Sequence, residues 1–242
     1  TAVYQFHSVL ADNFRKGNCF LMGDAAHQNP PFMGEGMNTG YRDAANLSWK
    51  IALTLLKNIT STNLLDTYEK ERKPHSKFIV ENSSRIGKLM EAYAEADNPD
   101  DVPQELVASG YGSFITPNLE EGLFFKGKAD DSMGAGQLFP QPTEIEEPIL
   151  IKKLDTLFGK GFSIVSKKKV FTTDEDKKFL ETLDTTFVLL KDKLIEQNPW
   201  LVSFMDYGEI FILRPDKYVF GCTSDTVTLE DLINDLRVRI GE

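Results

Sequence analysis

The fold of this chain is decided by residues 23–40, which read GDAAHQNPPFMGEGMNTG. A short apolar run ends just before this stretch, and an amphipathic helix is expected to begin at its end, near Met37. The glycine, proline and asparagine residues in between predict a loop. A loop that follows a buried strand and opens a helix lies outside the carboxyl end of that strand, where α/β sheets bind their ligands.

The residue types in this loop suit a flat ligand that carries hydroxyl groups. Asp24 offers a carboxylate that can accept hydrogen bonds from such hydroxyls. Pro31 stiffens the loop and presents a carbonyl without an amide hydrogen. Gly34 and Gly36 have no Cβ, so the backbone can approach a planar molecule closely.

The helix start adds a preference for negative charge. The amides of Met37 and Asn38 have no carbonyl four residues earlier, and the positive end of the helix dipole lies beside them. Such a helix start binds anions. The alternative is a strand, a turn and a capped helix with an incidental aspartate, but the length and order of the whole run favour a ligand site.

The run GDAAHQNPPFMGEGMNTGYRDAANLSWKIA, residues 23–52, resembles the second FAD signature of the single-component FAD-dependent aromatic hydroxylases, a family that includes phenol hydroxylase and hydroxyphenylpropionate hydroxylase. Residues 65–72, LDTYEKER, resemble the next helix of that family. Residues 134–142 and 214–216 resemble the C-terminal thioredoxin-like domain of its phenol hydroxylase branch. The resemblance implies an α/β fold with a partial, Rossmann-like FAD-binding domain followed by a small thioredoxin-like α/β domain.

The resemblance also implies roles for the residues of the loop. Asp24 would bind the ribityl or adjoining phosphate part of FAD, and amides at the helix start would contact the pyrimidine edge of the isoalloxazine ring. The cofactor-binding residues implied in this way are Gly23, Asp24, Pro31, Gly34, Gly36, Met37 and Asn38.

The substrate pocket is expected on the other side of the same loop. Pro31 would lie beside the flavin ring with its carbonyl toward the pocket, and Phe32 and Met33 are weaker candidates for the pocket wall. A histidine beside a flavin suggests acid or base chemistry, but His27 is expected to order the loop. The resemblance leaves the catalytic residues unassigned.

The function implied is a monooxygenase that uses FAD, NAD(P)H and O2 to hydroxylate a small phenolic or aromatic substrate. A related halogenase, epoxidase or antibiotic-modifying hydroxylase is an alternative, because the second FAD signature does not fix the substrate. A non-catalytic interaction module is a third alternative. The choice between NADH and NADPH stays open.

The chain also departs from the family. It contains no GxGxxG turn for the ADP half of FAD, nor the middle region that supplies most of the substrate pocket, so we expect it to be inactive alone. The thioredoxin-like part has no CxxC pair and is expected to serve as a lid or a subunit contact. A homodimer is therefore an open alternative.

Composition narrows the partners. The chain has 242 residues with 37 acidic and 27 basic side chains, a formal net charge of −10 that disfavours nucleic acid and anionic membrane surfaces. No apolar run approaches a membrane span, and no signal peptide opens the sequence, which predicts a cytoplasmic protein. Cys19 and Cys222 are expected to be two buried thiols in strands, with no disulfide, redox or metal role.

Three parts are expected along the chain: the FAD-binding part over residues 1–96, an irregular linker over 97–136 and the thioredoxin-like domain over 137–242. Periodicity predicts one helical face with Trp49 in the core. The full face comprises Ala45, Trp49, Ala52, Leu53 and Leu56. The strands are expected over 2–10, 18–22, 162–165, 186–190, 209–213 and 218–222, and the helices over 37–57, 64–73, 74–95 and 174–183, with a last helix between Thr228 and Gly241.

Outside the loop, four polar residues carry weaker expectations. Arg42 and Asp43 lie one turn into the helix and are expected to pair with neighbouring structure and not with a substrate. His7 and His75 have no partners that the sequence identifies, and they are expected to be structural or exposed.

Overall fold

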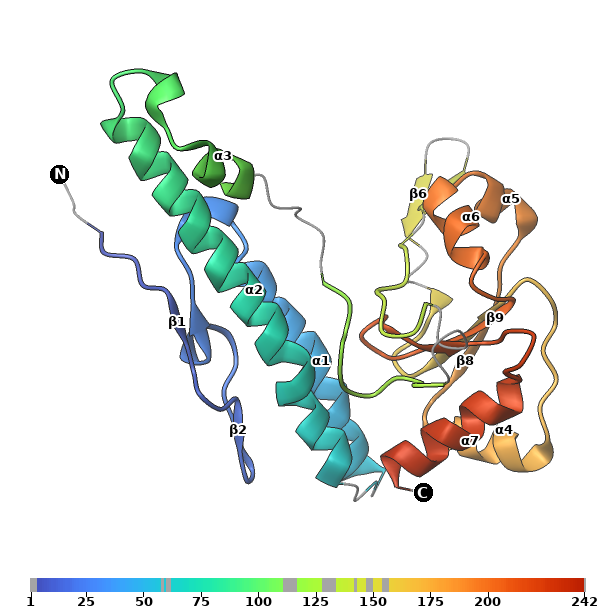
Figure 1. Ribbon diagram of the computed structural model, residues 1–242. Helices are drawn as coiled ribbons and strands as arrows, with labels where there is room; N and C mark the ends of the chain where they lie inside the picture. The colour runs from blue at the N-terminus through green and yellow to red at the C-terminus, as the bar shows by residue number, and fades with distance from the viewer. Residues whose placement is uncertain are drawn as a thin grey trace. The chain divides into compact units, whose positions relative to one another are not determined.

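A computed structural model describes residues 4–57, 59, 62–110, 117–127, 134–141, 143–146, 150–153 and 157–241 of the chain. The chain divides into two compact units. The first unit comprises Thr1–Leu47 and Tyr68–Pro117, and the second comprises Ser48–Thr67 and Asn118–Glu242. Two long helices, α1 (Gly36–Leu56) and α2 (Thr62–Glu95), contribute residues to both units (Figure 1).

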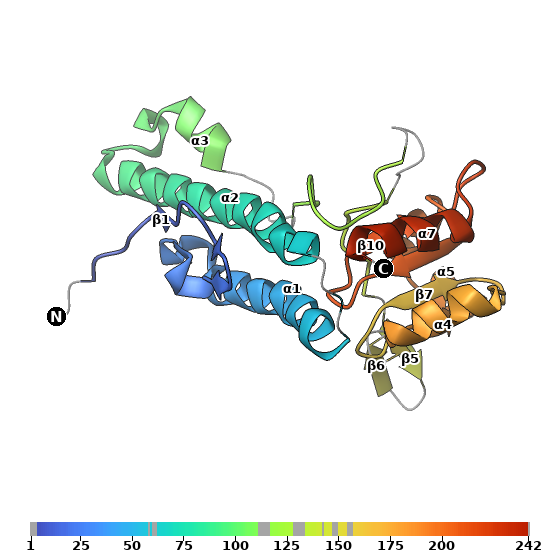
Figure 2. The ribbon, with the colours of Figure 1, turned by 90° about the horizontal axis from the view of Figure 1, so that it is seen from below.

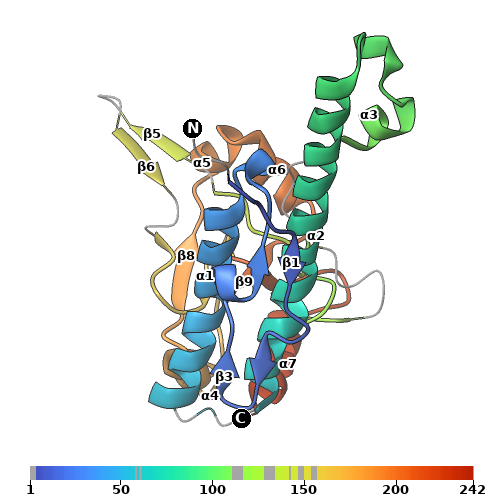
Figure 3. The ribbon, with the colours of Figure 1, turned by 90° about the vertical axis from the view of Figure 1, so that its left-hand side faces the viewer.

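Helices α1 and α2 run antiparallel and side by side (Figures 1 and 3). The bounds of α1 confirm the helix expected over 37–57, and Trp49 is buried as expected. Leu53 is also buried as expected and Ala52 is half-buried, but Ala45 and Leu56 are exposed, so the expected apolar face was wrong at its two ends. The side chains that α1 buries include Asp43, Asn46 and Lys50, so polar pairing as well as apolar packing sets its orientation.

The two helices expected over 64–73 and 74–95 are one helix, α2, with Pro74 inside it. Proline removes one intrahelical hydrogen bond and costs about 3 kcal/mol in a helix interior. Buried residues lie on both sides of Pro74, among them Tyr68, Arg72 and Ile79. Their common burial on both sides of the proline offsets its cost, so the prediction of a break at Pro74 was wrong.

Four two-residue strands form two small antiparallel pairs in the first unit, along one side of the two helices (Figures 1 and 3). Strand β1 (Val9–Leu10) pairs with β4 (His27–Gln28), and β2 (Arg15–Lys16) pairs with β3 (Cys19–Phe20). The strand expected over 18–22 is therefore shorter than predicted. Its burial was also wrong: Cys19 is exposed, because β3 belongs to a two-stranded hairpin and not to the middle of a sheet.

The described part of residues 97–136 contains two short helical segments. A 3₁₀ helix, Pro99–Asp101, is capped by Asn98, and α3 follows over Gln104–Gly110. The boundaries expected near residues 96 and 136 stay a prediction.

The second unit is built on a four-stranded sheet with the order β10-β9-β7-β8. Strands β7 (Ser163–Ser166) and β8 (Thr186–Leu189) are parallel, with α4 (Asp174–Thr182) connecting them. Strand β9 (Ile210–Leu213) is antiparallel to β7 and forms a hairpin with β10 (Val219–Cys222). All five of these elements were predicted at nearly these bounds, and the α/β fold class is confirmed.

Helices cover both faces of this sheet. On one face α4 and α7 (Leu229–Ile240) lie side by side (Figure 2) and bury an apolar cluster that includes Phe162, Ile164 and Leu236. On the other face, α5 (Asp192–Glu196) and α6 (Pro199–Met205) cover a second cluster around Phe211. These two short helices escaped prediction, as did the hairpin of β5 (Thr143–Glu146) and β6 (Leu150–Lys153).

The last helix begins and ends as its sequence predicts. The Thr228 hydroxyl accepts the Asp231 amide, and the Asp231 side chain accepts the Thr228 amide in return. Gly241 ends the helix in the left-handed conformation with a φ of 81°. Among the described residues, no helix is both long and apolar enough to cross a membrane.

Candidate functional site

The loop from Gly23 to the start of α1 is a series of tight turns. It contains two 3₁₀ turns, Gly23–Ala25 and Pro31–Met33, on either side of β4. Gly34 ends the second turn with a φ of 65°, which a residue with a Cβ rarely adopts. The glycine at this position is therefore required by the backbone of the loop itself.

Gly36 is different, because its backbone is not in the left-handed region. A Cβ built on Gly36 would meet nothing nearer than the Asn29 side chain at 3.5 Å. The folded chain thus has no steric need for glycine at Gly36. A ligand that lies close to this backbone would supply such a steric need.

The first turn of α1 is arranged by Glu35. Its carbonyl accepts both the amide and the hydroxyl of Thr39, and its carboxylate forms an ion pair of 2.7 Å with Arg42. Met37 and Asn38 lie in the exposed part of this turn. Their amides come before the helix can supply carbonyl partners, so they are suited to a ligand with negative charge.

All the residues predicted to bind cofactor or substrate lie in the first unit, on the loop from Gly23 and the first turn of α1. Most are exposed, namely Asp24, Pro31, Phe32, Gly34, Met37 and Asn38, whereas Gly23, Met33 and Gly36 are half-buried. Phe32 has a structural role as well. Its ring packs against Gly87 of α2, where a Cβ would lie 2.5 Å from a ring carbon, and against the Phe6 ring.

Beneath the loop lies a buried ionic network centred on Asp43 of α1. One carboxylate oxygen of Asp43 accepts the Gly23 amide at 3.0 Å and contacts His27 Nε2 at 2.7 Å. The other accepts Arg72 Nε of α2 at 2.8 Å. Gly23 begins the 3₁₀ turn that carries Asp24, and His27 follows this turn. Asp43 therefore connects the turn to both α1 and α2.

The network continues to the segment after α3. The Arg72 guanidinium donates to His75 Nδ1, and His75 Nε2 donates to the carbonyl of Pro117. Burial and the neighbouring charge of Arg72 lower the pKa of His75 to about 4. The imidazole is therefore neutral at pH 7, which matches its role as acceptor on one nitrogen and donor on the other.

The charge on Asp43 is held firmly. Burial raises the pKa of the carboxyl, but the hydrogen bond to His27 and the charge of Arg72 lower it by more, with help from the Gly23 amide. The pKa of Asp43 thus lies below its ordinary value. A carboxylate that stays ionised can hold the amide at Gly23 over the whole physiological pH range.

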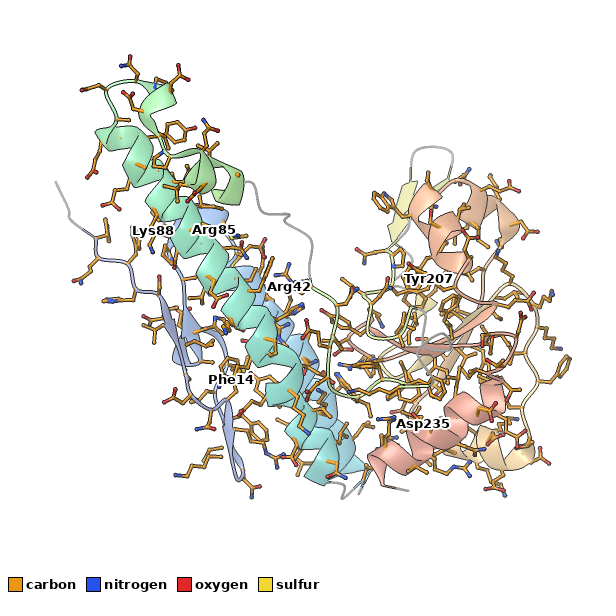
Figure 4. The ribbon with its side chains drawn as sticks, in the orientation of Figure 1. Phe14, Arg42, Arg85, Lys88, Tyr207 and Asp235 are labelled. Carbon is orange, nitrogen blue, oxygen red and sulfur yellow. The ribbon has the colours of Figure 1, made fainter. Side chains whose placement is uncertain are left out.

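Further polar contacts fasten the same region. Glu69 of α2 accepts the amides of Phe14 and Arg15, and the Tyr68 hydroxyl donates to the Leu21 carbonyl at 2.7 Å. Phe14, labelled in Figure 4 with Arg42, is fully buried, and its ring lies near those of His27 and Tyr68. The loop is therefore anchored from both sides.

The sequence assigned this network only in part. Arg42 and Asp43 pair with neighbouring structure, as expected, and His27 is anchored to Asp43. His75, expected to be structural or exposed, is structural: it is buried, and its partners, which the sequence did not identify, are Arg72 and the Pro117 carbonyl. The only signal in the sequence was the spacing of Arg72 and His75, one turn apart on a helix face, and that spacing does not reveal burial.

Comparison with known proteins agrees with the position of the loop. Residues 1–83 match a family model described as an FAD binding domain. The chain is 33% identical over 174 residues to a 3-(3-hydroxy-phenyl)propionate/3-hydroxycinnamic acid hydroxylase of Mycobacterium sp. (strain JLS), a match that covers 67% of this chain and 30% of that protein. The chain is thus similar to FAD-dependent aromatic hydroxylases, as its motif predicts. It spans less than half the length of the curated relatives it matches.

The similarity to these hydroxylases extends over nearly the whole chain. A probable NADH-specific resorcinol 4-hydroxylase of Rhodococcus jostii (strain RHA1) is 28% identical, over 97% of this chain and 45% of its own length. The crystal structure of the flavin-dependent monooxygenase PieE in complex with FAD and substrate shares the fold, with a TM-score of 0.69 and 18% identity, over 98% of this chain and 50% of that one. Both units therefore have counterparts in flavin monooxygenases.

Proposed function

We propose that the protein containing this chain is an FAD-dependent monooxygenase that hydroxylates a phenolic substrate with NAD(P)H and O2. The single observation that carries the proposal is the exposed loop of the first unit, which leads into the start of α1 and is anchored from beneath by Asp43. The match of residues 1–83 to an FAD binding domain supports the choice of cofactor. FAD supplies the redox chemistry when bound, and the chain positions it.

The residues of the loop fit the isoalloxazine end of FAD. The amides of the exposed residues Met37 and Asn38, at the start of α1, suit the pyrimidine edge, which carries negative charge in the reduced state. Gly36 has room for a close neighbour, since a Cβ there would meet no described atom closer than 3.5 Å. Asp24, exposed on its turn, would accept hydrogen bonds from ribityl hydroxyls, and Gly23 and Gly34 would shape the backbone around it.

Pro31 and its neighbours would face the substrate. Pro31 and Phe32 are exposed and Met33 is half-buried, so together they offer an apolar edge for an aromatic ring. The relatives named above act on 3-(3-hydroxyphenyl)propionate and resorcinol, which are both phenols. We therefore propose a small phenol as substrate.

Three finer points belong to the same proposal. A nicotinamide nucleotide would reduce the flavin, as the name of the Rhodococcus relative suggests for that protein. The protein would act in the cytoplasm. The second unit would contribute a lid or a subunit contact, and sedimentation velocity of the full-length protein would reveal a homodimer directly.

The activity is tested on the full-length protein. It should purify yellow with bound FAD, and it should oxidise NADH or NADPH faster when resorcinol or 3-(3-hydroxyphenyl)propionate is added. A colourless product without such stimulation by any phenol would contradict the proposal and favour an interaction module.

The role of Asp24 has its own test. Asp24→Ala should lower the fraction of protein that retains FAD after gel filtration, because hydrogen bonds to the cofactor are lost. Asp12→Ala is the matched control, since Asp12 is an exposed aspartate of the same unit outside the loop. Equal flavin content in both variants would remove the role assigned to Asp24.

A further inference from the structure

The second unit has a hollow at one end of its sheet, and none of the residues assigned to cofactor or substrate lines it. Strand β8 is the last strand in the order β10-β9-β7-β8 and pairs in parallel with β7. The register places Phe187 beside Ile164, and Leu189 beside Ser166. Residues paired in this way point to the same face of a sheet.

That face is the one that α4 and α7 cover. Ile164 belongs to the apolar cluster beneath these two helices, whereas Val165 and Val188 belong to the cluster on the opposite face. The cover does not reach the end of the sheet, because Phe187 is 48% and Leu189 59% exposed. Two large apolar side chains thus remain open to solvent beside a well-packed core.

The segment after β7 closes the hollow on its other side. Val170 and Thr172 line it together with Phe187 and Leu189, and its volume is about 400 Å³. Sites for small organic molecules have volumes of roughly 300–1,000 Å³ and mostly apolar walls with a few polar groups. The hollow has this size and this kind of wall.

The charged side chains that line the hollow are all positive. Lys168, Lys169 and Lys177 line it, and no aspartate or glutamate is among the described residues that do so. The chain has 37 acidic and 27 basic side chains. A wall whose charged side chains are all lysines therefore differs from the charge composition of the chain as a whole. Lys168 lies 3.0 Å from Glu209 and Lys169 lies over the Phe171 ring, but for the Lys177 side chain no ion pair occurs in the described part of the chain.

We propose that this hollow is a second binding site of the protein, for a small molecule with an apolar body and one carboxylate. The apolar body would cover Phe187 and Leu189, which removes apolar surface from water. The carboxylate would lie toward Lys177 at the end of the hollow, where its charge is complementary. The site shares no residue with the flavin loop and does not depend on the redox activity proposed above.

The proposal is tested by calorimetric titration of the 242-residue chain with 2-naphthoate. We expect saturable binding of one molecule, and weaker binding of the neutral analogue 2-naphthalenemethanol. Lys177→Glu should raise the Kd of 2-naphthoate about fivefold or more, because a favourable exposed charge becomes a repulsive one. Leu189→Ser should raise it through lost apolar contact.

The matched control is Lys178→Glu. Lys178 is the next residue of α4, is also exposed and is not part of the wall, so the same change of net charge should alter the Kd less than about twofold. Circular dichroism of each variant checks that the fold is retained.

Four results would overturn the proposal: no binding of 2-naphthoate, an equal effect of Lys177→Glu and Lys178→Glu, equal affinity for the neutral analogue, or a stable dimer that Leu189→Ser dissociates. The last result would mean that a second copy of the chain covers the hollow.

Discussion

The two units of this chain bury different kinds of side chain. In the first unit, polar and charged side chains make up much of the described interior, with Asp43 and Arg72 at the centre. In the second unit, the interior is mainly apolar, and its two largest clusters lie on the two faces of a sheet. The first arrangement fixes the position of a loop through directional bonds, and the second stabilises a sheet through buried area.

This difference predicts different responses to mutation, and the largest effects are expected in the two interiors. Arg72→Met should destabilise the first unit by about 3–5 kcal/mol, because it leaves the Asp43 carboxylate buried without its cation. Hydrogen exchange by mass spectrometry, followed in peptides from residues 68–95, measures this loss locally. Lys77→Met, on the same helix but exposed, is the control and should cost less than about 0.5 kcal/mol.

The matching change in the second unit is Phe211→Ala. Phe211 is fully buried and packs against the rings of Phe139 and Phe204, so we expect a loss of about 3–5 kcal/mol. Trp49 and Trp200 both belong to the second unit, so tryptophan fluorescence during urea unfolding reports on it alone. The comparison would fail if Phe211→Ala left the urea midpoint unchanged.

The next effect is on the pH dependence of the first unit. The pKa of folded His75 is about 4, below the ordinary value of 6.5, so the unfolded chain binds an extra proton between these two pH values. Stability should therefore be full above pH 6.5 and should fall by about 3 kcal/mol as the pH drops to 4. The lowered pKa of Asp43 adds a further loss only below its ordinary value of 3.8.

His75→Asn isolates this contribution, since asparagine does not titrate. Hydrogen exchange of residues 68–95, corrected for the intrinsic rate at each pH, should show a weaker pH dependence in the variant. An equal slope in the variant and the parent would show that other groups cause the acid sensitivity.

A smaller effect is expected where glycine meets a side chain. Gly87→Ala would normally favour a helix, but the Phe32 ring occupies the position of the new methyl group. We expect a net loss of about 1–3 kcal/mol in the first unit. Gly161→Ala in the second unit should cost more, because its Cβ would meet the carbonyl oxygens of Leu183 and Asp184, and backbone yields less easily than a ring. A stabilising Gly87→Ala would mean that Phe32 is free to move.

The smallest effect is expected at the start of α7. Thr228→Ala removes the hydroxyl that caps the helix and should cost about 1 kcal/mol in the second unit. Fluorescence-detected urea unfolding measures it. Thr228→Ser keeps the hydroxyl and should restore most of the loss; if it does not, the cap is not the cause.

The contrast between the units also explains what the sequence could predict. The sheet strands and α7 were predicted because their signals are local: apolar runs, turn residues such as Pro215, and a cap at Thr228. The buried face of α1 was not predicted in full, because Asp43 and Lys50 are charged. A prediction from apolar periodicity assigns charged residues to the surface, but these two are buried. The partners of Asp43, which are Gly23, His27 and Arg72, are distant in sequence, so the network becomes visible only when α1 and α2 are paired. The loop residues were identified from a motif, and their contact with a cofactor stays a prediction.

We propose that the loop holds a flavin against the start of α1, and the Gly36→Ala variant tests this most directly. The fold leaves room for a Cβ there, so Gly36→Ala should leave the unfolding free energy of the full-length protein unchanged within about 0.5 kcal/mol. If the ring lies against this backbone, the added methyl group should raise the Kd of FAD about tenfold or more. A variant that is equally stable and binds FAD with the parent affinity would contradict the account.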